Sequence, residues 1–282
     1  MRLRKSLWRL AIVVLVLLLS VNSYAGNNCK AVYGRGAHEI RLATGSPGEL
    51  GLLKVLANEF NKSHNTRICW IKAGSGKSLA LLKAKKVDVV LVHAPEAEKR
   101  AVNEGWATRR TLIGCNEFYI GPKDDPARIA SAKTAVEAYT KIAKAKAKFL
   151  SRGDNSGTHK RELFIWKKAG ITPTGKWYII TRDFMMATLK KADELRGYFM
   201  TDSSTWVVAR KDMRNLKVLF KGDPLLINVY HGLCQPHCKP EAAAFLEFLI
   251  SEKGQKIIRD YGKDAYGESL YHDAQYAEQY ER

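Results

Sequence analysis

Strand-like and helix-like segments alternate along the chain from about residue 38 onward. Residues 87–92 form a dense apolar run with a single aspartate, as in a parallel strand that is buried on both faces. Residues 49–63 instead place their apolar side chains on one face of a helix, and residues 240–260 repeat this pattern. Such alternation predicts an α/β fold whose mostly parallel sheets are flanked by helices. With 282 residues, the chain is long enough for two small lobes.

The first 25 residues have the pattern of a secretory signal peptide. Four arginine and lysine residues among the first nine positions precede an apolar run at residues 10–19, and small residues occupy positions 23 and 25. The apolar run is much shorter than the roughly 20 residues that a membrane-spanning helix needs, so cleavage is favoured over a retained anchor. We therefore expect residues 1–25 to be removed during export to the periplasm.

The strong positive charge of the chain does not identify its partner. The formal net charge of +19 fits nucleic acid, anionic surfaces or anionic solutes, and fits a general solubility trait equally well. Much of the excess lies in helix-like stretches such as residues 141–148, which are typical of a solvated helix face. The sequence has no basic repeat with interleaved aromatic residues and no nucleic-acid-binding motif, so we expect no nucleic-acid partner.

Five cysteines, an odd number, leave at least one thiol outside the intramolecular disulfides. Export to an oxidising compartment makes disulfides plausible. Cys234 and Cys238 lie close together with His231 and His237 beside them, a cluster that could also bind a soft metal. No second cysteine pair completes a zinc site. A disulfide that involves Cys234 or Cys238 is therefore the favoured interpretation, and we expect no bound metal.

Three loops share a construction that suits an anion. Residues 44–46, 74–78 and 154–158 each follow a predicted strand, are rich in glycine and hydroxyl side chains, and open a predicted helix. The unpaired N–H groups and the positive dipole end of a helix N-terminus can hold an anion. Plain N-capping would use the same residues, and for a single loop it is the better explanation. Three such loops at the carboxyl ends of strands favour a composite site.

Arg152 is the single side chain best suited to an oxyanion. It directly precedes the third loop, and a guanidinium can donate hydrogen bonds to two oxygens of one anion. The alternative is a salt bridge to Asp154 or another local acid. Residue type and position alone leave these two roles equal.

Neither a nucleotide site nor a catalytic site is indicated. Residues 76–78 resemble the end of a P-loop, but that motif requires glycine where Ile71 stands. His93, His159 and Cys115 are interpreted as structural. The sequence has no nucleophile–base–acid arrangement and no recognisable pair of carboxylates. We therefore expect a protein that binds its ligand without turnover and without a cofactor.

Two longer motifs carry a family resemblance. They are residues 88–95, DVVLVHAP, and residues 151–162, SRGDNSGTHKRE, with residues 51–53 before them and residues 116–126 between them. In this order they resemble the tungstate-binding proteins of ABC importers. The resemblance covers about residues 40–261, and the second motif is long enough to be specific.

The resemblance implies a type II periplasmic-binding fold, in which two α/β lobes are joined by two crossing strands and the ligand lies between them. Lobe one would be residues 38–115 plus 236–282, and lobe two would be residues 116–235. The two crossing strands would lie near Phe118 and Leu233.

This implied arrangement also bears on the cysteines. Cys115 and Cys234 would lie on neighbouring crossing strands. A Cys115–Cys234 disulfide therefore competes with a Cys234–Cys238 disulfide, and both pairings stay open.

The resemblance further implies the ligand and the path it takes. The lobes would close by a hinge motion on a tetrahedral oxyanion, tungstate or molybdate, and a monomeric protein would deliver it to an ABC permease of the inner membrane. The side chains implied to face the anion are Thr44, Ser46, Ser75, Arg152, Ser156 and Thr158.

The chain departs from the family pattern in three loops, and other functions stay open. Residues 43–50 carry fewer hydroxyls, residues 184–186 are Phe-Met-Met in place of Gly-Met-Gly, and residues 202–205 are Asp-Ser-Ser-Thr in place of Asp-Arg-Gly-Thr. Phosphate carries a proton at neutral pH that Asp154 could accept, so a phosphate- or sulfate-binding protein is one alternative. A binding module that reports to a sensor and an exported enzyme acting on phosphate or sulfate esters are the others.

Overall fold

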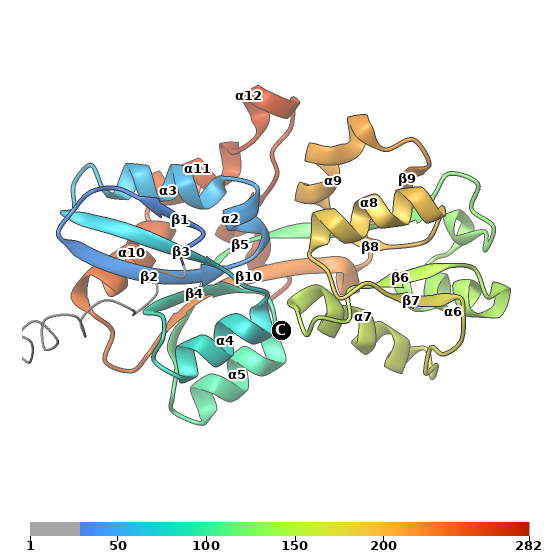
Figure 1. Cartoon of the computed structure of the whole chain (residues 1–282), viewed down its shortest axis with the longest axis horizontal. Helices are drawn as coiled ribbons and strands as arrows, with labels where there is room; N and C mark the ends of the chain where they lie inside the picture. The colour runs from blue at the N-terminus through green and yellow to red at the C-terminus, as the bar shows by residue number, and fades with distance from the viewer. Residues whose placement is uncertain (1–28, 282) are drawn as a thin grey trace, which may run out of the picture.

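The computed structural model describes residues 29–281, which form two lobes lying side by side along the long axis of the molecule (Figure 1). The predicted signal peptide, residues 1–25, lies outside the described residues. In this described part, no helix is both long and apolar enough to cross a lipid bilayer.

The first lobe contains the predicted parallel strands, and the short strand β1 (Ala31–Tyr33), which was not predicted, precedes them. The parallel strands are β2 (His38–Thr44), β3 (Thr66–Lys72) and β4 (Val89–Val92). Its first helices are α2 (Ser46–Glu49), α3 (Leu52–Phe60), α4 (Ser75–Lys83) and α5 (Pro95–Asn103). β2 pairs in parallel with β3 and β4, and β1 pairs with β3 antiparallel. All of β4 is buried, because helices cover both faces of this sheet (Figure 1).

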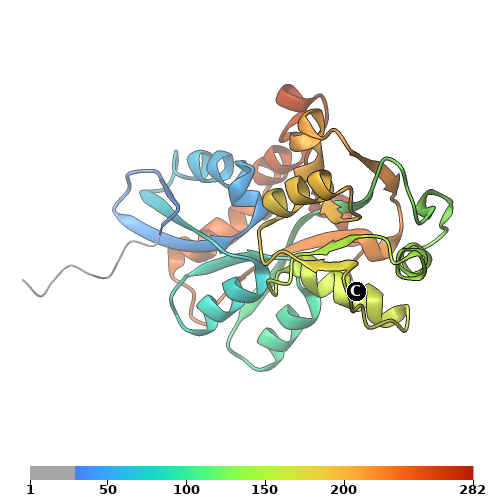
Figure 2. The same cartoon turned by 45° about the vertical axis from the view of Figure 1, so that its right-hand side comes forward.

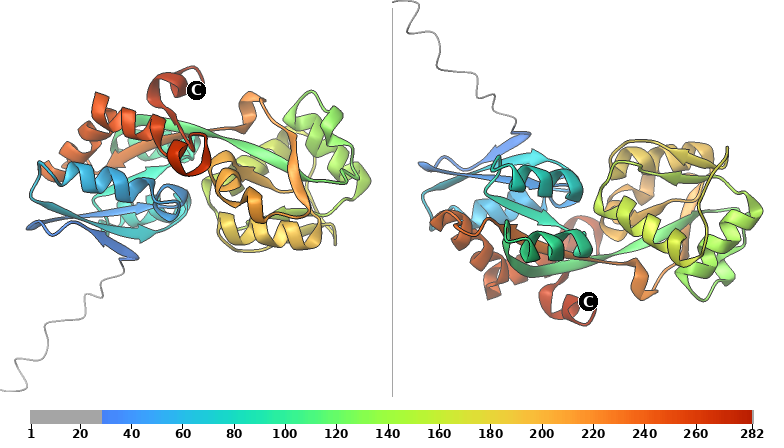
Figure 3. Two further views of the ribbon diagram at one scale, coloured as in Figure 1. Left: turned by 90° about the horizontal axis from the view of Figure 1, so that it is seen from above. Right: turned by 90° about the horizontal axis from the view of Figure 1, so that it is seen from below.

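Two long strands, β5 (Thr108–Pro122) and β10 (Ile227–Cys234), connect the lobes (Figure 3). β5 pairs with β10 through residues 108–117 and then continues into the second lobe. Between them the chain forms η1 (Ile129–Ser131), α6 (Ala135–Ala145), β6 (Phe149–Ser151), α7 (Gly157–Lys168), β7 (Tyr178–Ile180), α8 (Met185–Leu195), β8 (Met200–Asp202), α9 (Ser203–Ala209), η2 (Arg210–Asp212), β9 (Leu216–Phe220) and η3 (Pro224–Leu226).

The C-terminal segment returns to the first lobe and differs from its prediction. It forms α10 (Pro240–Ile250), α11 (Glu252–Asp260), α12 (Lys263–Tyr266), β11 (His272–Asp273) and α13 (Ala274–Glu278). The single helix predicted over residues 240–260 is broken at Ser251, whose extended backbone lets its Oγ accept a hydrogen bond from the Gly254 N–H at 3.2 Å. After α12 the chain joins the sheet, where β11 pairs with β5 antiparallel.

One sheet of nine strands therefore runs through both lobes. Its order is β1-β3-β2-β4-β10-β5-β11, and β8 and β9 pair with the second-lobe part of β5. β6 and β7 form a separate parallel pair. The mixed α/β architecture with parallel strands flanked by helices confirms the predicted fold class.

Each lobe has its own apolar core. In the second lobe the Trp166 ring meets Tyr139 and Phe149 edge-on, with ring centroids 4.4 Å and 5.2 Å apart. Such edge-to-face pairs add about 0.5–1.5 kcal/mol each beyond area burial. In the first lobe, Phe60 of α3 packs against Phe245 of α10, so the C-terminal helices complete the core that the N-terminal strands begin.

The second crossing lies earlier in the chain than the sequence predicted. Leu233, the expected position, pairs with Val90 of β4 and is fully buried within the first lobe. The chain has therefore already returned to this lobe when it reaches Leu233. The lobe limits of residues 38–115 with 236–282, and 116–235, stay a prediction, and the β10 pairing favours moving the second limit toward Ile227.

The same register decides the cysteine pairing. Cys115 lies opposite Val229, and Cys234 lies opposite Thr108. Along β10 this separates the two cysteine positions by five residues, about 16 Å, whereas a disulfide needs Cα atoms within about 7 Å. The alternative Cys115–Cys234 disulfide is therefore wrong, and Cys115 is a buried free thiol.

Two disulfides form among the remaining cysteines, Cys234–Cys238 and Cys29–Cys69. The sequence indicated no partner for Cys29, because only the pairing of β1 with β3 brings it beside Cys69. With both sulfurs of Cys234 and Cys238 in a disulfide, no thiolate is left there for the soft metal that the sequence also allowed.

The two disulfides should stabilise the protein unequally. Replacing Cys29 and Cys69 together by serine should lower the free energy of unfolding by about 4 kcal/mol, against about 2 kcal/mol for Cys234 and Cys238, because the sequence separations are 40 and 4. Urea unfolding measures both values, and a reversed order would contradict the loop-closure argument.

Thiol titration of the unreduced, denatured wild type should find one reactive thiol, that of Cys115.

Candidate functional site

A small cavity lies between the lobes, where the three predicted loops meet. Ser46 and Ser75 line it from the first lobe, and Arg152 and Ser156 line it from the second. These residues follow the carboxyl ends of β2, β3 and β6, where the ligands of open α/β sheets bind. The enclosed space measures about 10 Å³, room for about one water molecule, so the lobes must move slightly apart to admit an anion. Four of the six residues implied by the resemblance thus share one cavity.

The other two implied residues do not line the cavity. Thr44 is fully buried, and its Oγ1 donates a hydrogen bond to the Leu91 carbonyl at 2.9 Å, which ties the end of β2 to β4. Thr158 lies in the first turn of α7, is 2 % exposed, and its Oγ1 has no hydrogen-bond partner among the described residues. The structure therefore gives Thr44 a supporting position behind the wall, and direct binding by either threonine stays a prediction.

The three serines have different local partners. Ser156 caps α7, since its Oγ accepts a hydrogen bond from a backbone N–H in the first turn at 3.3 Å. Ser75 Oγ accepts from the His93 N–H at 3.2 Å, and Ser46 Oγ donates to Asp202 Oδ2 across the lobes at 3.4 Å. The N-capping explanation thus applies to Ser156, whereas no side chain caps α2 or α4. The starts of α4 and α7 can offer further backbone N–H groups to an anion.

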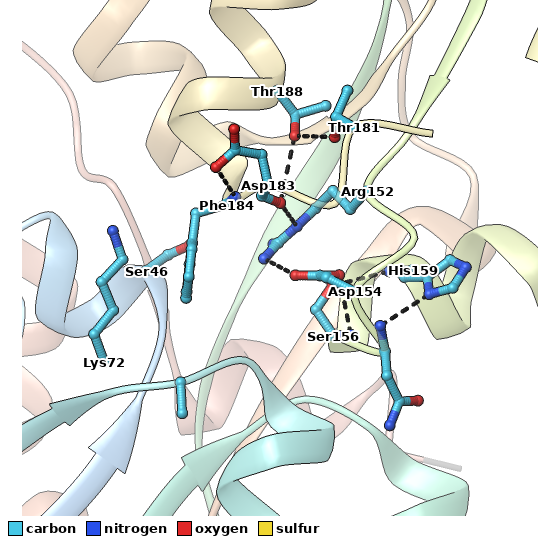
Figure 4. A network of polar contacts seen from close by, with 12 residues as sticks. Ser46, Lys72, Arg152, Asp154, Ser156, His159, Thr181, Asp183, Phe184 and Thr188 are labelled. Atoms are coloured by element: carbon cyan, nitrogen blue, oxygen red, sulfur yellow. Dashed lines mark hydrogen bonds and ion pairs between the residues drawn. The ribbon is translucent and has the colours of Figure 1, made fainter. Parts of the chain in front are cut away.

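Arg152 is buried, with 4 % of its surface exposed. Its Nη2 donates to Asp154 Oδ2 at 2.6 Å, and its Nε donates to the Asp183 carbonyl at 3.2 Å (Figure 4). Asp154 also accepts a hydrogen bond from the Ser156 N–H at 3.1 Å. The salt-bridge alternative is therefore present. It still leaves part of the five-donor guanidinium for an anion, while Asp154 holds the side chain in place.

His93 lines the cavity too, although the sequence indicated only a structural role. Burial, followed by the charges of Arg152 and Arg161, lowers the pKa of His93 to about 3, so the ring is neutral at neutral pH. The ring packs against Tyr230 with 4.7 Å between centroids. The position of His93 directly after a buried parallel strand was the signal that could have identified it. Tyr230 has no such signal, because every residue of β10 is buried.

Apolar side chains complete the wall. Leu91, Tyr230 and Phe184, the residue before α8, line the cavity beside the hydroxyls. By excluding water they lower the local dielectric, and this strengthens hydrogen bonds and charge interactions inside the cavity.

Glycine lets the two lobes touch beside the cavity. A Cβ added to Gly74 would lie 3.0 Å from Ser156 Cβ, and one added to Gly76 would lie 2.5 Å from the Asn155 carbonyl oxygen. Larger side chains at these positions would hold the second loop, in the first lobe, apart from the third loop, in the second lobe. The structure therefore has the lobes closed on the cavity, and the glycines permit that closure.

A larger hollow of about 420 Å³ lies between α5 and α7, which face each other on the same side of the molecule (Figure 2). His93 belongs to both walls and lies between the two spaces. The lining of this hollow includes no serine or threonine and is partly apolar, as with Phe164. We place the candidate site in the smaller cavity, because only there do the hydroxyl loops and Arg152 converge.

Comparison with known proteins agrees with this geometry. A family model described as a PBP superfamily domain matches residues 31–253. The tungstate-binding protein TupA of Peptoclostridium acidaminophilum is 36 % identical over 241 residues, which cover 82 % of this chain and 84 % of that protein.

Solved structures give the same result. The structure titled as the tungstate ABC transporter from Geobacter sulfurreducens is 38 % identical, with a TM-score of 0.71 over 80 % of this chain and 100 % of that chain. The tungstate-binding protein TupA from Desulfovibrio alaskensis is 37 % identical, with a TM-score of 0.69 over 84 % of this chain and 99 % of that chain. The chain therefore belongs to the PBP superfamily, in the family of these tungstate-binding relatives.

Proposed function

We propose that this protein is an exported, periplasmic solute-binding protein that captures a tetrahedral oxyanion, tungstate or molybdate, and delivers it to an ABC permease of the inner membrane. The observation that carries the proposal is the buried Arg152 guanidinium in a cavity whose hydroxyls come from both lobes. The relative from Peptoclostridium acidaminophilum, named as tungstate-binding, supports the same ligand class. In this proposal residues 1–25 are removed on export, and the protein works as a monomer without a cofactor.

The lobes would capture the anion by a hinge motion. β5 and β10 connect the lobes, so bending there separates Ser46 and Ser75 from Arg152 and Ser156. When the lobes close, donors from both sides reach one anion. Binding and closure are then the same event, because a complete set of donors exists only in the closed form.

The donors also bear on selectivity. A fully deprotonated dianion offers no proton and needs donors alone, whereas hydrogen phosphate needs an acceptor as well. Asp154 does not line the cavity, and its oxygens accept hydrogen bonds from Arg152 and from the Ser156 N–H, which leaves this carboxylate poorly placed for phosphate. His93 adds no charge, because its pKa is lowered to about 3. We therefore favour tungstate and molybdate over phosphate.

The site is proposed to bind without catalysis. Ser75 Oγ accepts a hydrogen bond from the His93 backbone and does not donate to its ring. The lowered pKa also makes the His93 ring a weak general base at neutral pH. No observation favours an esterase, a sulfate-binding protein or a sensor-coupled module over a solute-binding protein for tungstate or molybdate.

Calorimetric titration of the protein without residues 1–25 tests the ligand. Tungstate or molybdate should bind with a Kd below about 1 μM, and Arg152→Ala should weaken this binding by about 1.5–3 kcal/mol, because a charge-assisted hydrogen bond is lost. Arg214→Ala is the matched control, since this exposed arginine lies outside the cavity and the charge change is identical. Sulfate and phosphate complete the set. A folded sample that gives no heat with any of the four anions would refute the proposal.

The neutral state of His93 predicts a pH dependence of stability. Between about pH 6.5 and pH 3 the unfolded chain binds a proton at His93 and the folded chain does not, so stability falls as the pH falls. The wild type should lose about 2 kcal/mol more than His93→Gln between pH 7 and pH 5, in urea unfolding at both values. Parallel pH profiles of the two proteins would mean that His93 is not held neutral.

A further inference from the structure

Phe184 occupies a position from which it can control access to the anion cavity. It is the N-cap residue of α8 in the second lobe, and its half-buried ring forms part of the cavity wall. The same ring reaches the first lobe, where Lys72 Nζ lies 4.2 Å from the ring centroid. One side chain of the second lobe thus touches both the cavity and the opposite lobe.

Two cations lie against this ring. Arg152 Cζ lies 5.6 Å from the centroid, and Figure 4 shows Lys72 and Arg152 on opposite sides of Phe184. The negative face of an aromatic ring attracts a cation within about 6 Å, and the attraction grows when water is excluded. The ring therefore keeps two like charges apart while it attracts both.

Lys72 is held in the right place for this contact. It is the last residue of β3, and its Nζ forms an ion pair with Glu49 Oε1 of α2 at 2.9 Å. Both side chains are about a quarter exposed, at 27 % and 24 %. The ion pair stays within the first lobe, whereas the contact with Phe184 crosses to the second lobe and can break when the lobes open.

We propose that Lys72 and Phe184 form a latch that closes the cavity over its anion and sets the rate at which the anion leaves. The ring covers the Arg152 side of the cavity, and Lys72 holds the ring from the other lobe. Release then requires the Lys72–Phe184 contact to break first. This inference rests on the proposed oxyanion function, because it concerns the same cavity.

Two conservative substitutions distinguish a role of this contact in anion release from a role in packing alone. Phe184→Leu keeps an apolar side chain but removes the ring, and Lys72→Met keeps the aliphatic stem but removes the charge. Stopped-flow displacement of tungstate and of molybdate should show dissociation rates about 3- to 30-fold faster in each variant, the range that one cation–aromatic contact allows. The double variant should exceed the faster single variant by less than about threefold, because both changes remove one contact.

Lys83→Met is the matched control. Lys83 Nζ lies 5.1 Å from the centroid of the Trp106 ring, within the first lobe and outside the cavity wall. The variant loses the same charge and the same type of contact, so its dissociation rates should equal those of the wild type. Rates that rise as much in Lys83→Met, rates unchanged in both latch variants, or effects that simply multiply in the double variant would each overturn the latch.

Small-angle X-ray scattering separates failure of the latch from failure of the proposed function. If the wild type binds neither tungstate nor molybdate, the oxyanion function fails, and scattering of the protein without added anion then decides the latch. A larger radius of gyration in both Phe184→Leu and Lys72→Met than in the wild type supports it. Identical curves for the three proteins, each shown to be folded by circular dichroism, overturn it.

Discussion

The Arg152 guanidinium can stay buried because two of its N–H groups have acceptors. Asp154 accepts one hydrogen bond at 2.6 Å, and the Asp183 carbonyl accepts the other at 3.2 Å. A guanidinium buried without such partners would destabilise the fold by several kcal/mol. Asp154 also accepts from the Ser156 N–H, so the charge balance of Arg152 and the shape of the third loop depend on one carboxylate. The cavity can therefore present a positive charge to an anion and stay folded without it.

The rest of the cavity follows from the way the lobes meet around this charge. Gly74 and Gly76 allow the first-lobe loop to approach the second lobe, and Ser46 reaches Asp202 across the gap. Burial raises the pKa of Asp202, which lies away from solvent at the start of α9. Apolar rings exclude water from the cavity. Closure, desolvation and hydrogen bonding are thus properties of one contact surface between the lobes, which neither lobe has alone.

Local patterns predicted the elements that depend on local physics. The buried run of β4, the amphipathic face of α3 and the loop before α7 all lie where hydrophobic period and glycine-rich turns indicated. Sequence patterns did not predict the structure where contacts with residues distant in the chain determine it. The continuous apolar face over residues 240–260 gave no sign of the break at Ser251, and nothing in the last twenty residues indicated that β11 would pair with β5.

The sequence by itself determined the fold class, the three hydroxyl loops and Arg152, because hydrophobic period, glycine and a guanidinium act through their immediate neighbours. Only the tertiary structure decided that Thr44 lies behind the wall, that Tyr230 and Phe184 lie in it, and that Cys115 stays unpaired. These outcomes depend on strand register and on the approach of two lobes, which join residues far apart in the chain. Local sequence patterns contain no information on such long-range contacts. They therefore predicted the hydrogen-bond donors of the site but not the other residues that line the cavity.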